Sequence, residues 1–389
     1  VRLLSMFKIN KIIVDNDTLK EFINKCLKQK VLAIDTEFIR DNTYYPILCL
    51  VQIAGKDFAA AIDPLSGIDM NPIWDLLSNE KILKIFHSGR QDIEIFLNLT
   101  GKIPKPIYDT QIAAMFCGLG DQVGYEKLVD KFLNLSINKE NQFTNWLQRP
   151  LTKSQLDYAI SDVTHLIKIF PSVNKLILDA GRQEWVSKEI EKLYKKDLYN
   201  VNPEEAWKRI KIKYSKSETL NILKILAKWR ENKCKERNIP RNRLIRDETL
   251  VNISLFKLNK IDLFNKIRGM PKNVSVGDLN EIMKIIKDAE KIDPNTWPKV
   301  TKFNKKSNVN KCSLDFLKLL LVYCSEESGL AEKLIADTDD LKSILDGKRE
   351  GLKVFEGWRY DVFGKVVDLL LEGKLGFTIE NFKVKKISF

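Results

Sequence analysis

The pattern of apolar and polar positions changes once along the chain. In the first 200 residues, short apolar runs with many β-branched residues predict strands. These runs are VLAIDTEF (31–38), PILCLVQIAG (46–55), DFAAAID (57–63) and KILKIFH (81–87). The short turn at 55–57 predicts that the second and third strands form an antiparallel hairpin. Apolar residues at helical spacing then predict helices over 90–97, 109–117, 124–133 and 152–170. We therefore expect a mixed α/β domain here.

Beyond about residue 203 the strand pattern stops. Apolar residues three and four apart predict a helix over 217–238, with Ser217 as its N-cap. The polar stretch 293–310 predicts a linker, and a second helical unit follows over 313–375. A chain of 389 residues is too long for one compact core. We expect three domains, an α/β domain followed by two helical domains, over residues 1–200, 205–295 and 310–389.

The composition, 44% hydrophobic and 30% charged residues, is typical of a globular protein. No run of about 18 apolar residues occurs, and the amino-terminal segment lacks a signal-peptide pattern, so we expect no membrane association. The order of strands first, with an antiparallel start, and helices later does not fit a doubly wound nucleotide-binding fold, and neither GxGxxG nor a P-loop motif occurs. Six scattered cysteines without a CxxC pair indicate free thiols and a cytoplasmic protein: Cys26, Cys49, Cys117, Cys234, Cys312 and Cys324.

The net charge of +13 is concentrated in the second half of the chain. Residues 1–200 hold 26 Lys+Arg and 25 Asp+Glu, whereas residues 201–389 hold 39 and 27. The segment 208–246 alone holds 14 basic and 3 acidic residues. Such a local excess indicates a surface for a polyanion. Genome composition would explain why Lys supplies 51 of the 65 basic residues, but not why they gather in one segment.

Two acids in the first predicted strand are the most informative residues. Asp35 and Glu37 stand two positions apart, so their side chains project from one face of the strand. Two neighbouring charges inside an apolar strand are costly unless a cation neutralises them. An isolated Asp-x-Glu pair more often marks a solvated strand edge. Further acids are needed to favour a metal site over that alternative.

Such acids occur in two of the predicted helices. Asp92 lies just inside the helix that follows the fourth strand, and Asp162 lies in the helix over 152–170. Tyr158 precedes Asp162 by four residues, about 40° away on the same helical face. Four carboxylates suit a pair of Mg²⁺ or Mn²⁺ ions, because hard cations take oxygen ligands in two-metal phosphodiesterases. The residues thus predict metal-dependent phosphodiester hydrolysis.

These residues lie in segments that resemble the ribonuclease D branch of the DEDD exonucleases over nearly the whole chain. AIDTEF resembles the first exonuclease motif, and FHSGRQDIEIF resembles the second. RDNTYYPILCLVQIA, PIYDTQIAAMFCG and WLQRPLTKSQLDYAISDV resemble the stretches that connect these motifs and lead into the third. A tyrosine four residues before the last acid matches the tyrosine subclass. The histidine subclass carries His where this chain has Asp157.

The resemblance implies an RNase H-like fold and a 3′→5′ exoribonuclease that releases 5′-mononucleotides and trims 3′ ends of tRNA precursors. In the family pattern Asp35 bridges two divalent ions, Glu37 and Asp162 complete the nucleophile-side ion, and Asp92 holds the other. Tyr158 orients the attacking water. Two alternatives stay open: a 3′→5′ DNA exonuclease of proofreading or helicase-associated type, and a non-catalytic nucleic-acid-binding scaffold. The presence of all four acids and the tyrosine argues against the scaffold.

Residues beside the motifs lead to weaker predictions. Phe38 either stacks on the terminal base or packs in the core, and His87 either contacts substrate or is a structural histidine. Asp109 matches a family position that we expect to cap a helix. The family often reads DKSxxRSDW where this chain has NKENQFTNW (138–146), so Asn145 replaces an acid.

The basic segment resembles the HRDC domain, a helical module shared by helicases and ribonuclease D. The match covers 226–250 and is strongest around W-R-E and R-N-I-P-R-N-R-L-I-R-D. Arg241, Arg243 and Arg246 either bind phosphates or form salt bridges that fix this loop. The segment GWRYDVFGKVVDLLLEGK (357–374) resembles the carboxy-terminal helical domain of the same family.

Overall fold

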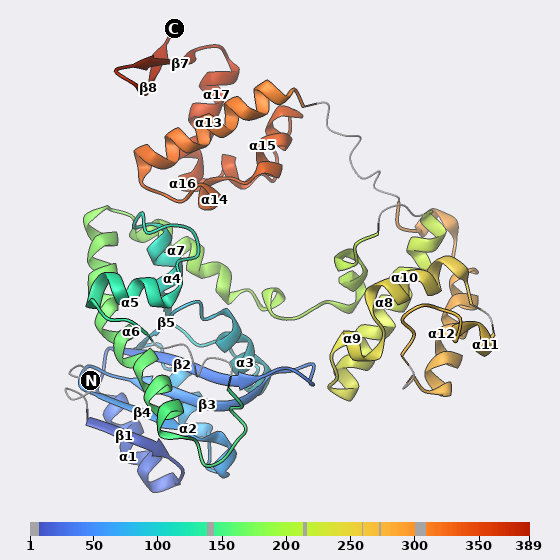
Figure 1. The fold of residues 1–389 in the computed structure, drawn as a ribbon, viewed down its shortest axis with the longest axis horizontal. Helices are drawn as coiled ribbons and strands as arrows, with labels where there is room; N and C mark the ends of the chain where they lie inside the picture. The colour runs from blue at the N-terminus through green and yellow to red at the C-terminus, as the bar shows by residue number, and fades with distance from the viewer. Residues whose placement is uncertain (1–7, 138–143, 213–215, 259, 272–273, 300–308) are drawn as a thin grey trace.

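A computed structural model describes residues 8–137, 144–212, 216–258, 260–271, 274–299 and 309–389. Most of the predicted linker 293–310 and of the loop 138–146 lies outside these residues or at their edges. Three parts follow one another along the chain in Figure 1: a sheet with helices, a helical part to its right and a second helical part above.

A mixed six-stranded sheet forms the first part, in the order β1-β4-β3-β2-β5-β6. Its strands are β1 (Lys8–Ile13), β2 (Val31–Ile39), β3 (Ile47–Ala54), β4 (Phe58–Ile62), β5 (Leu83–Phe86) and β6 (Ile107–Asp109). Strand β3 pairs antiparallel with both β2 and β4, which confirms the predicted hairpin. The other pairs, β1 with β4, β2 with β5 and β5 with β6, are parallel. The sequence patterns missed β1 and β6; β6 has three residues, too few to show an alternation.

Helices cover both faces of this sheet (Figure 1). They are α1 (Asn16–Cys26), α2 (Asn71–Ser78), α3 (Arg90–Thr100), α4 (Thr110–Met115), α5 (Tyr125–Leu133), α6 (Lys153–Asp179) and α7 (Gln183–Glu191). The long helix α6 lies across one face and contacts β2, β3, β4 and β5. Small residues of the sheet, among them Ala33 and Ala61, let Ala159 and Val163 of α6 approach closely. Helix α6 continues through Pro171 for a further eight residues to Asp179, beyond the predicted end at 170.

The second part is helical and has an apolar core of its own. Its elements are η5 (Pro203–Arg209), α8 (Ser217–Arg237), α9 (Arg241–Leu244), α10 (Asp247–Phe256), α11 (Ile261–Phe264), α12 (Val276–Ala289) and η6 (Pro294–Thr296). The predicted helix over 217–238 is confirmed as α8. The predicted cap is wrong: Ser217 is the first helical residue, and Lys216 precedes it without a side-chain capping bond.

The third part contains α13 (Lys311–Ser328), α14 (Glu332–Ile335), α15 (Thr338–Leu345), α16 (Gly357–Arg359) and α17 (Lys365–Leu371), followed by the hairpin β7 (Leu375–Glu380) and β8 (Lys383–Ser388). The expectation of an all-helical second half is therefore wrong at its end. The hairpin turns at Asn381 and Phe382, whose φ angles are both positive, 51° and 63°. Hairpin turns of this kind usually carry Gly at the second position. Because Phe stands there instead, the Asn-Gly signal of a hairpin is absent.

The third part packs against the first. Trp358 stacks on Trp185 with 5.5 Å between ring centroids, and Arg359 Nη1 lies 2.7 Å from Glu189 Oε1. Their buried apolar residues form one continuous cluster. The predicted division into three domains stays a prediction, since the packing separates only the second part from the others.

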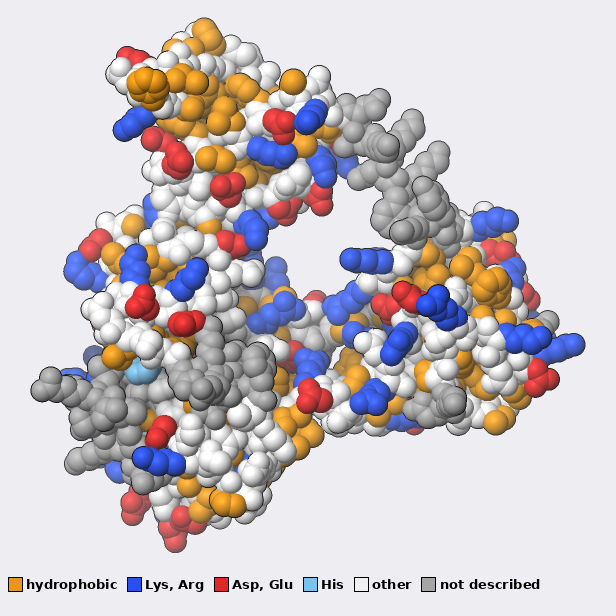
Figure 2. All heavy atoms as spheres, in the orientation of Figure 1, with side chains coloured by type: hydrophobic (Ala, Val, Ile, Leu, Met, Phe, Trp, Pro, Cys, Tyr) orange, Lys and Arg blue, Asp and Glu red, His pale blue; other side chains and the backbone are white. Residues whose placement is uncertain are grey.

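Lys and Arg side chains, together with some Asp and Glu side chains, border the central opening between the three parts (Figure 2). Of the helices that the structure describes, none combines the length and the apolar character needed to cross a membrane. The six cysteines are unpaired thiols.

Candidate active site

Three of the predicted acids come together where β2 meets α6. Asp35 and Glu37 project from β2, and Asp162 projects from α6. One carboxylate oxygen of each lies within 4.8 Å of the others, close enough for one cation to contact all three. The strand pairing is irregular here: Glu37 opposes Leu50, whereas Phe38 opposes Leu48, so Cys49 is an extra residue on β3. Such bulges re-aim side chains and are frequent beside active sites.

Asp92, the fourth acid, lies in the first turn of α3 and is buried. It is not one of the three clustered carboxylates. Instead the hydroxyl of Thr36, between Asp35 and Glu37 on β2, donates a hydrogen bond to its Oδ1. The charge of Asp92 nevertheless raises the pKa of both Asp35 and Glu37. The fourth acid therefore borders the other three and is fixed through Thr36, a residue that the sequence analysis had not singled out.

Burial and mutual repulsion raise the pKa of these carboxyl groups. Burial raises the pKa of Asp35 well above its ordinary value, and the charges of Asp92, Asp162 and Glu37 add to the effect. Burial also raises the pKa of Glu37 to about 9, of Asp162 to about 7 and of Asp92 to about 6. Oxygen donors at this spacing and charge suit a hard divalent cation, which would relieve the repulsion.

Two tyrosines contact the Asp162 end of the site. The phenol of Tyr158, one helical turn earlier on α6, hydrogen-bonds the carboxylate of Asp162. Burial raises the pKa of Tyr158, and the three nearest carboxylates raise it further, so the phenol keeps its proton. Tyr125, at the start of α5, donates a hydrogen bond from its phenol to the backbone carbonyl of Asp162. No sequence signal had pointed to Tyr125.

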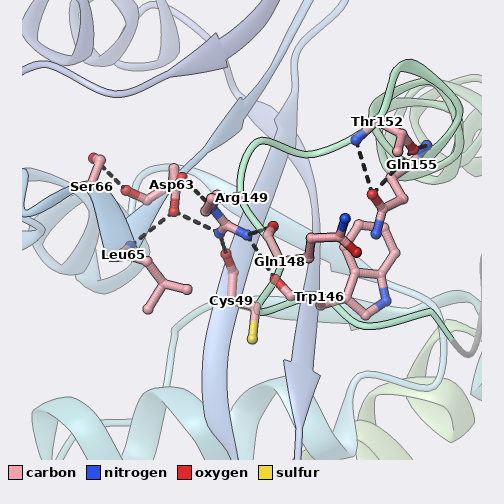
Figure 3. A network of polar contacts seen from close by, with 9 residues as sticks. All are labelled: Cys49, Asp63, Leu65, Ser66, Trp146, Gln148, Arg149, Thr152 and Gln155. Atoms are coloured by element: carbon pink, nitrogen blue, oxygen red, sulfur yellow. Dashed lines mark hydrogen bonds and ion pairs between the residues drawn. The ribbon is translucent and has the colours of Figure 1, made fainter.

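Arg149 fixes the chain just before α6, as Figure 3 shows. Its guanidinium binds both carboxylate oxygens of Asp63, at 2.6 and 2.8 Å. It also donates to the carbonyls of Trp146 (2.7 Å), Gln148 (2.9 Å) and Cys49 (2.7 Å). All five N–H donors of the side chain are thereby used. This one side chain therefore joins the bulged residue of β3, the end of β4 and the loop before α6.

This network continues into the capped start of α6. Thr152 and Gln155 form a capping box, and Gln155 also donates to the hydroxyl of Thr144 at 3.1 Å. The ring of Trp146 lies 6.3 Å from that of Tyr158. The helix turn that carries Tyr158 is therefore held against the sheet from its amino-terminal side.

We expect Arg149→Met to destabilise the protein by about 3 kcal/mol, because the buried carboxylate of Asp63 is left without its partner. The measurement is the free energy of unfolding in urea. Arg349→Met is the matched control, since its ion pair with Asp368 is more than half exposed at the arginine, 58%. Exposed pairs contribute about 1 kcal/mol or less. Equal losses in the two variants would contradict the anchoring role of Arg149.

The residues predicted beside the motifs, Asp109, Phe38 and His87, differ in their contacts. Asp109 caps α4, accepting from Gln111 N (2.8 Å) and Ile112 N (3.3 Å), as predicted. Phe38 is half-buried against the main apolar core. His87 hydrogen-bonds the hydroxyl of Thr110 at 3.0 Å and packs on Tyr125, and burial lowers its pKa. Substrate contacts by Phe38 and His87 stay predictions.

The three predicted arginines of the basic segment differ in their contacts. Arg241 forms a bidentate ion pair with the buried carboxylate of Glu231, at 2.5 and 2.8 Å. Arg243 donates to Asn42 of the β2–β3 connection at 2.9 Å. Arg246 is exposed at the start of α10. The salt-bridge alternative thus applies to Arg241, and phosphate binding by the three stays a prediction.

Comparison with known proteins gives two family matches. Residues 10–178 match the 3′-5′ exonuclease family, and residues 219–286 match the HRDC domain. The first range contains the four acids and Tyr158, and the second contains most of the basic segment.

Curated relatives match over nearly the whole length. Ribonuclease D of Zymomonas mobilis is 43% identical over 97% of this chain and 98% of its own. Ribonuclease D of Bartonella henselae is 36% identical over 97% of this chain and 94% of its own. Among solved structures, Escherichia coli RNase D, described as an exoribonuclease involved in structured RNA processing, superposes with a TM-score of 0.80 at 26% identity. That match covers 93% of this chain and 98% of the other. The chain therefore belongs to the ribonuclease D family of 3′→5′ exoribonucleases.

Proposed function

We propose that this exoribonuclease uses two divalent cations, Mg²⁺ or Mn²⁺, held by Asp35, Glu37, Asp92 and Asp162, and trims the 3′ ends of tRNA precursors. The observation that carries the metal proposal is the cluster of Asp35, Glu37 and Asp162 within 4.8 Å. Its donors are all carboxylate oxygens, the set that Mg²⁺ and Mn²⁺ prefer. The tRNA substrate rests on the family resemblance.

Each acid has a distinct task in this proposal. Asp35, on which the charges of the other three acids all act, would contact both ions, while Glu37 and Asp162 would hold the ion beside the attacking water. Asp92, oriented by Thr36, would hold the ion beside the leaving oxygen. When bound, such ions lower the pKa of the attacking water and stabilise negative charge on the departing oxygen.

Tyr158 would orient the water rather than deprotonate it. Its raised pKa keeps the phenol protonated, and a protonated phenol can accept one hydrogen bond while donating another. The hydrogen bond to Asp162 fixes the direction of the phenol. The phenol oxygen is thus available to the water that attacks the scissile phosphorus.

Digestion of end-labelled RNA tests the reaction directly. With a 5′ label, shortening from the 3′ end yields a ladder of products, whereas a 3′ label is released at once as a mononucleotide. EDTA should abolish both results, and Mg²⁺ or Mn²⁺ should restore them. A DNA oligonucleotide of the same sequence is the matched control. Release of nucleotides from the 5′ end, or digestion that persists in EDTA, would refute the proposal.

Acid pKa values above their ordinary range also predict how the metal-free protein responds to pH. The folded state keeps protons that the unfolded chain, with carboxyl pKa values near 4, has released. The contribution of these acids to stability is therefore greatest at low pH and is lost as pH rises through about 6, 7 and 9, the values of Asp92, Asp162 and Glu37. Divalent cation should flatten this dependence.

The measurement is the melting temperature between pH 5 and 9, in EDTA and in Mg²⁺. Asp35→Asn, which lacks one of the repelling charges, should show a shallower fall in EDTA. Identical pH profiles with and without Mg²⁺ in the wild-type protein would mean that the acids do not bind the ion.

A further inference from the structure

A cleft separates the exonuclease part from the first helical part. Two adjoining cavities of about 370 and 200 Å³ form it and share Arg40, Tyr44, Val201, Arg209 and Arg241. Its walls are the β2–β3 connection, helix α3, the segment that enters the second part, and helices α8 and α9. We call these two cavities the interdomain cleft.

The interdomain cleft is lined by an excess of positive charge. Its only acids among the lining residues are Glu94 and Asp247. Its cations are Arg40, Arg90, Arg209, Arg230, Lys235 and Arg241. Five are arginines, whose planar guanidinium groups match the oxygens of phosphate. The charge and the residue type both suit a phosphodiester backbone.

Most of these cations are held rigidly by protein groups. Arg241 pairs with Glu231, which also accepts a hydrogen bond from the phenol of Tyr44 across the cleft. Arg40 pairs with Glu94 at 2.8 Å, and Lys235 donates to the carbonyl of Val201 at 2.9 Å. These contacts preorganise the walls, so a ligand does not have to order them.

One cation of the cleft is left for a ligand. Arg209 is exposed and has no ion pair or hydrogen bond to any residue that the structure describes. Arg230, by contrast, is only 3% exposed and binds Ile245 O and Asp247 Oδ1, so a ligand in the cleft cannot reach it.

The cleft is also near the acids along the chain, because Arg40 directly follows β2. Arg40 follows Glu37 by three residues, which at the rise of an extended strand is roughly 10 Å. An RNA strand with its terminal phosphodiester at the acids can therefore reach the cleft with its neighbouring nucleotides. The near-neutral charge of residues 1–200 leaves the exonuclease part little else with which to hold a backbone.

We propose that the interdomain cleft binds the phosphates of the RNA strand on the 5′ side of the scissile bond, with Arg209 as the residue that contacts them directly. This inference rests on the proposed function for its substrate. It assigns phosphate binding to the junction between the two parts, through an arginine outside the predicted set of Arg241, Arg243 and Arg246.

Binding of a 5′-fluorescent single-stranded RNA dodecamer, followed by anisotropy in EDTA, tests the proposal without requiring catalysis. Arg209→Gln should raise the Kd roughly tenfold and lower the log–log salt slope by about 0.7. Lys208→Gln is the matched control: Lys208 is the adjacent residue, is 59% exposed and pairs with Glu205 outside the cleft. Equal weakening by the two substitutions would overturn the proposal in favour of diffuse charge.

A second measurement locates the contact on the RNA. Single phosphodiesters of the dodecamer are replaced in turn by uncharged methylphosphonates. We expect one internal linkage, 5′ of the scissile bond, whose replacement weakens wild-type binding but not that of Arg209→Gln. Absence of such a linkage refutes the inference. The inference is also overturned if inorganic phosphate binds the cleft as well as RNA does, because the cleft would then be a simple anion site. If the wild-type protein binds the dodecamer but does not hydrolyse it in Mg²⁺, the catalytic proposal fails. The binding measurements in EDTA still test the cleft independently.

Discussion

Asp35→Asn is expected to lower RNA hydrolysis by a factor on the order of 10³ or more while leaving RNA binding intact. The lost charge lies among the three clustered carboxylates and is proposed to contact both ions, so each ion loses part of its binding. Stabilisation of charge by a metal ion is worth several kcal/mol, and each 1.4 kcal/mol changes the rate about tenfold. The measurement is single-turnover hydrolysis of 5′-labelled RNA at saturating Mg²⁺.

The same substitution should raise the melting temperature of the metal-free protein. Asp35 is half-buried, and desolvation together with three neighbouring carboxylates raises its pKa, so its ionised form destabilises the fold when no cation is present. Asp157→Asn is the matched control, because Asp157 is an exposed acid on α6 next to Tyr158. Activity of Asp35→Asn within tenfold of wild type would remove this residue from the metal site.

The residues of this site that could be predicted are those whose spacing matches the repeat of a strand or of a helix. Asp35 and Glu37 share a strand face at a spacing of two, and Tyr158 and Asp162 share a helix face at a spacing of four. Their presence in β2 and α6 followed from apolar runs long enough to show the period. That these residues meet at one point was expected only from the family resemblance. Asp162 follows Glu37 by 125 residues, and at that separation the sequence carries no local signal of contact.

The parts that were missed depend on contacts between distant residues. Arg149 meets Asp63 across 86 residues of chain, and its role depends on a bulge at Cys49 that alternation cannot show. Tyr125 donates to the backbone carbonyl of Asp162, and every residue has such a carbonyl, so the sequence does not indicate this contact. Arg209 lies in a run of basic residues, and the sequence does not distinguish it from its neighbour Lys208. Only the fold shows that Arg209 lines the cleft whereas Lys208 pairs with Glu205.

Tyr158→Phe is expected to lower kcat by about 10²-fold, the scale of one positioned acid–base or orienting group. The substitution removes only the phenol oxygen, so the ring should keep its packing beside Trp146 and the helix its capping box. Metal affinity should change little, because the phenol is proposed as a partner of the water and not as a ligand. The measurements are kcat at saturating RNA and the Mg²⁺ concentration that gives half-maximal activity.

The comparison of these two values separates the two uses of the hydrogen bond between Tyr158 and Asp162. If the phenol serves only to hold the carboxylate, its loss should raise the required Mg²⁺ concentration and leave kcat near normal once the metal saturates. If it orients the water, kcat stays low at every Mg²⁺ concentration. Tyr125→Phe provides the contrast, since Tyr125 holds the backbone of the same residue from the side of α5. A kcat that recovers fully with added Mg²⁺ in Tyr158→Phe would therefore assign the tyrosine to metal binding and leave the orientation of the water to the acids alone.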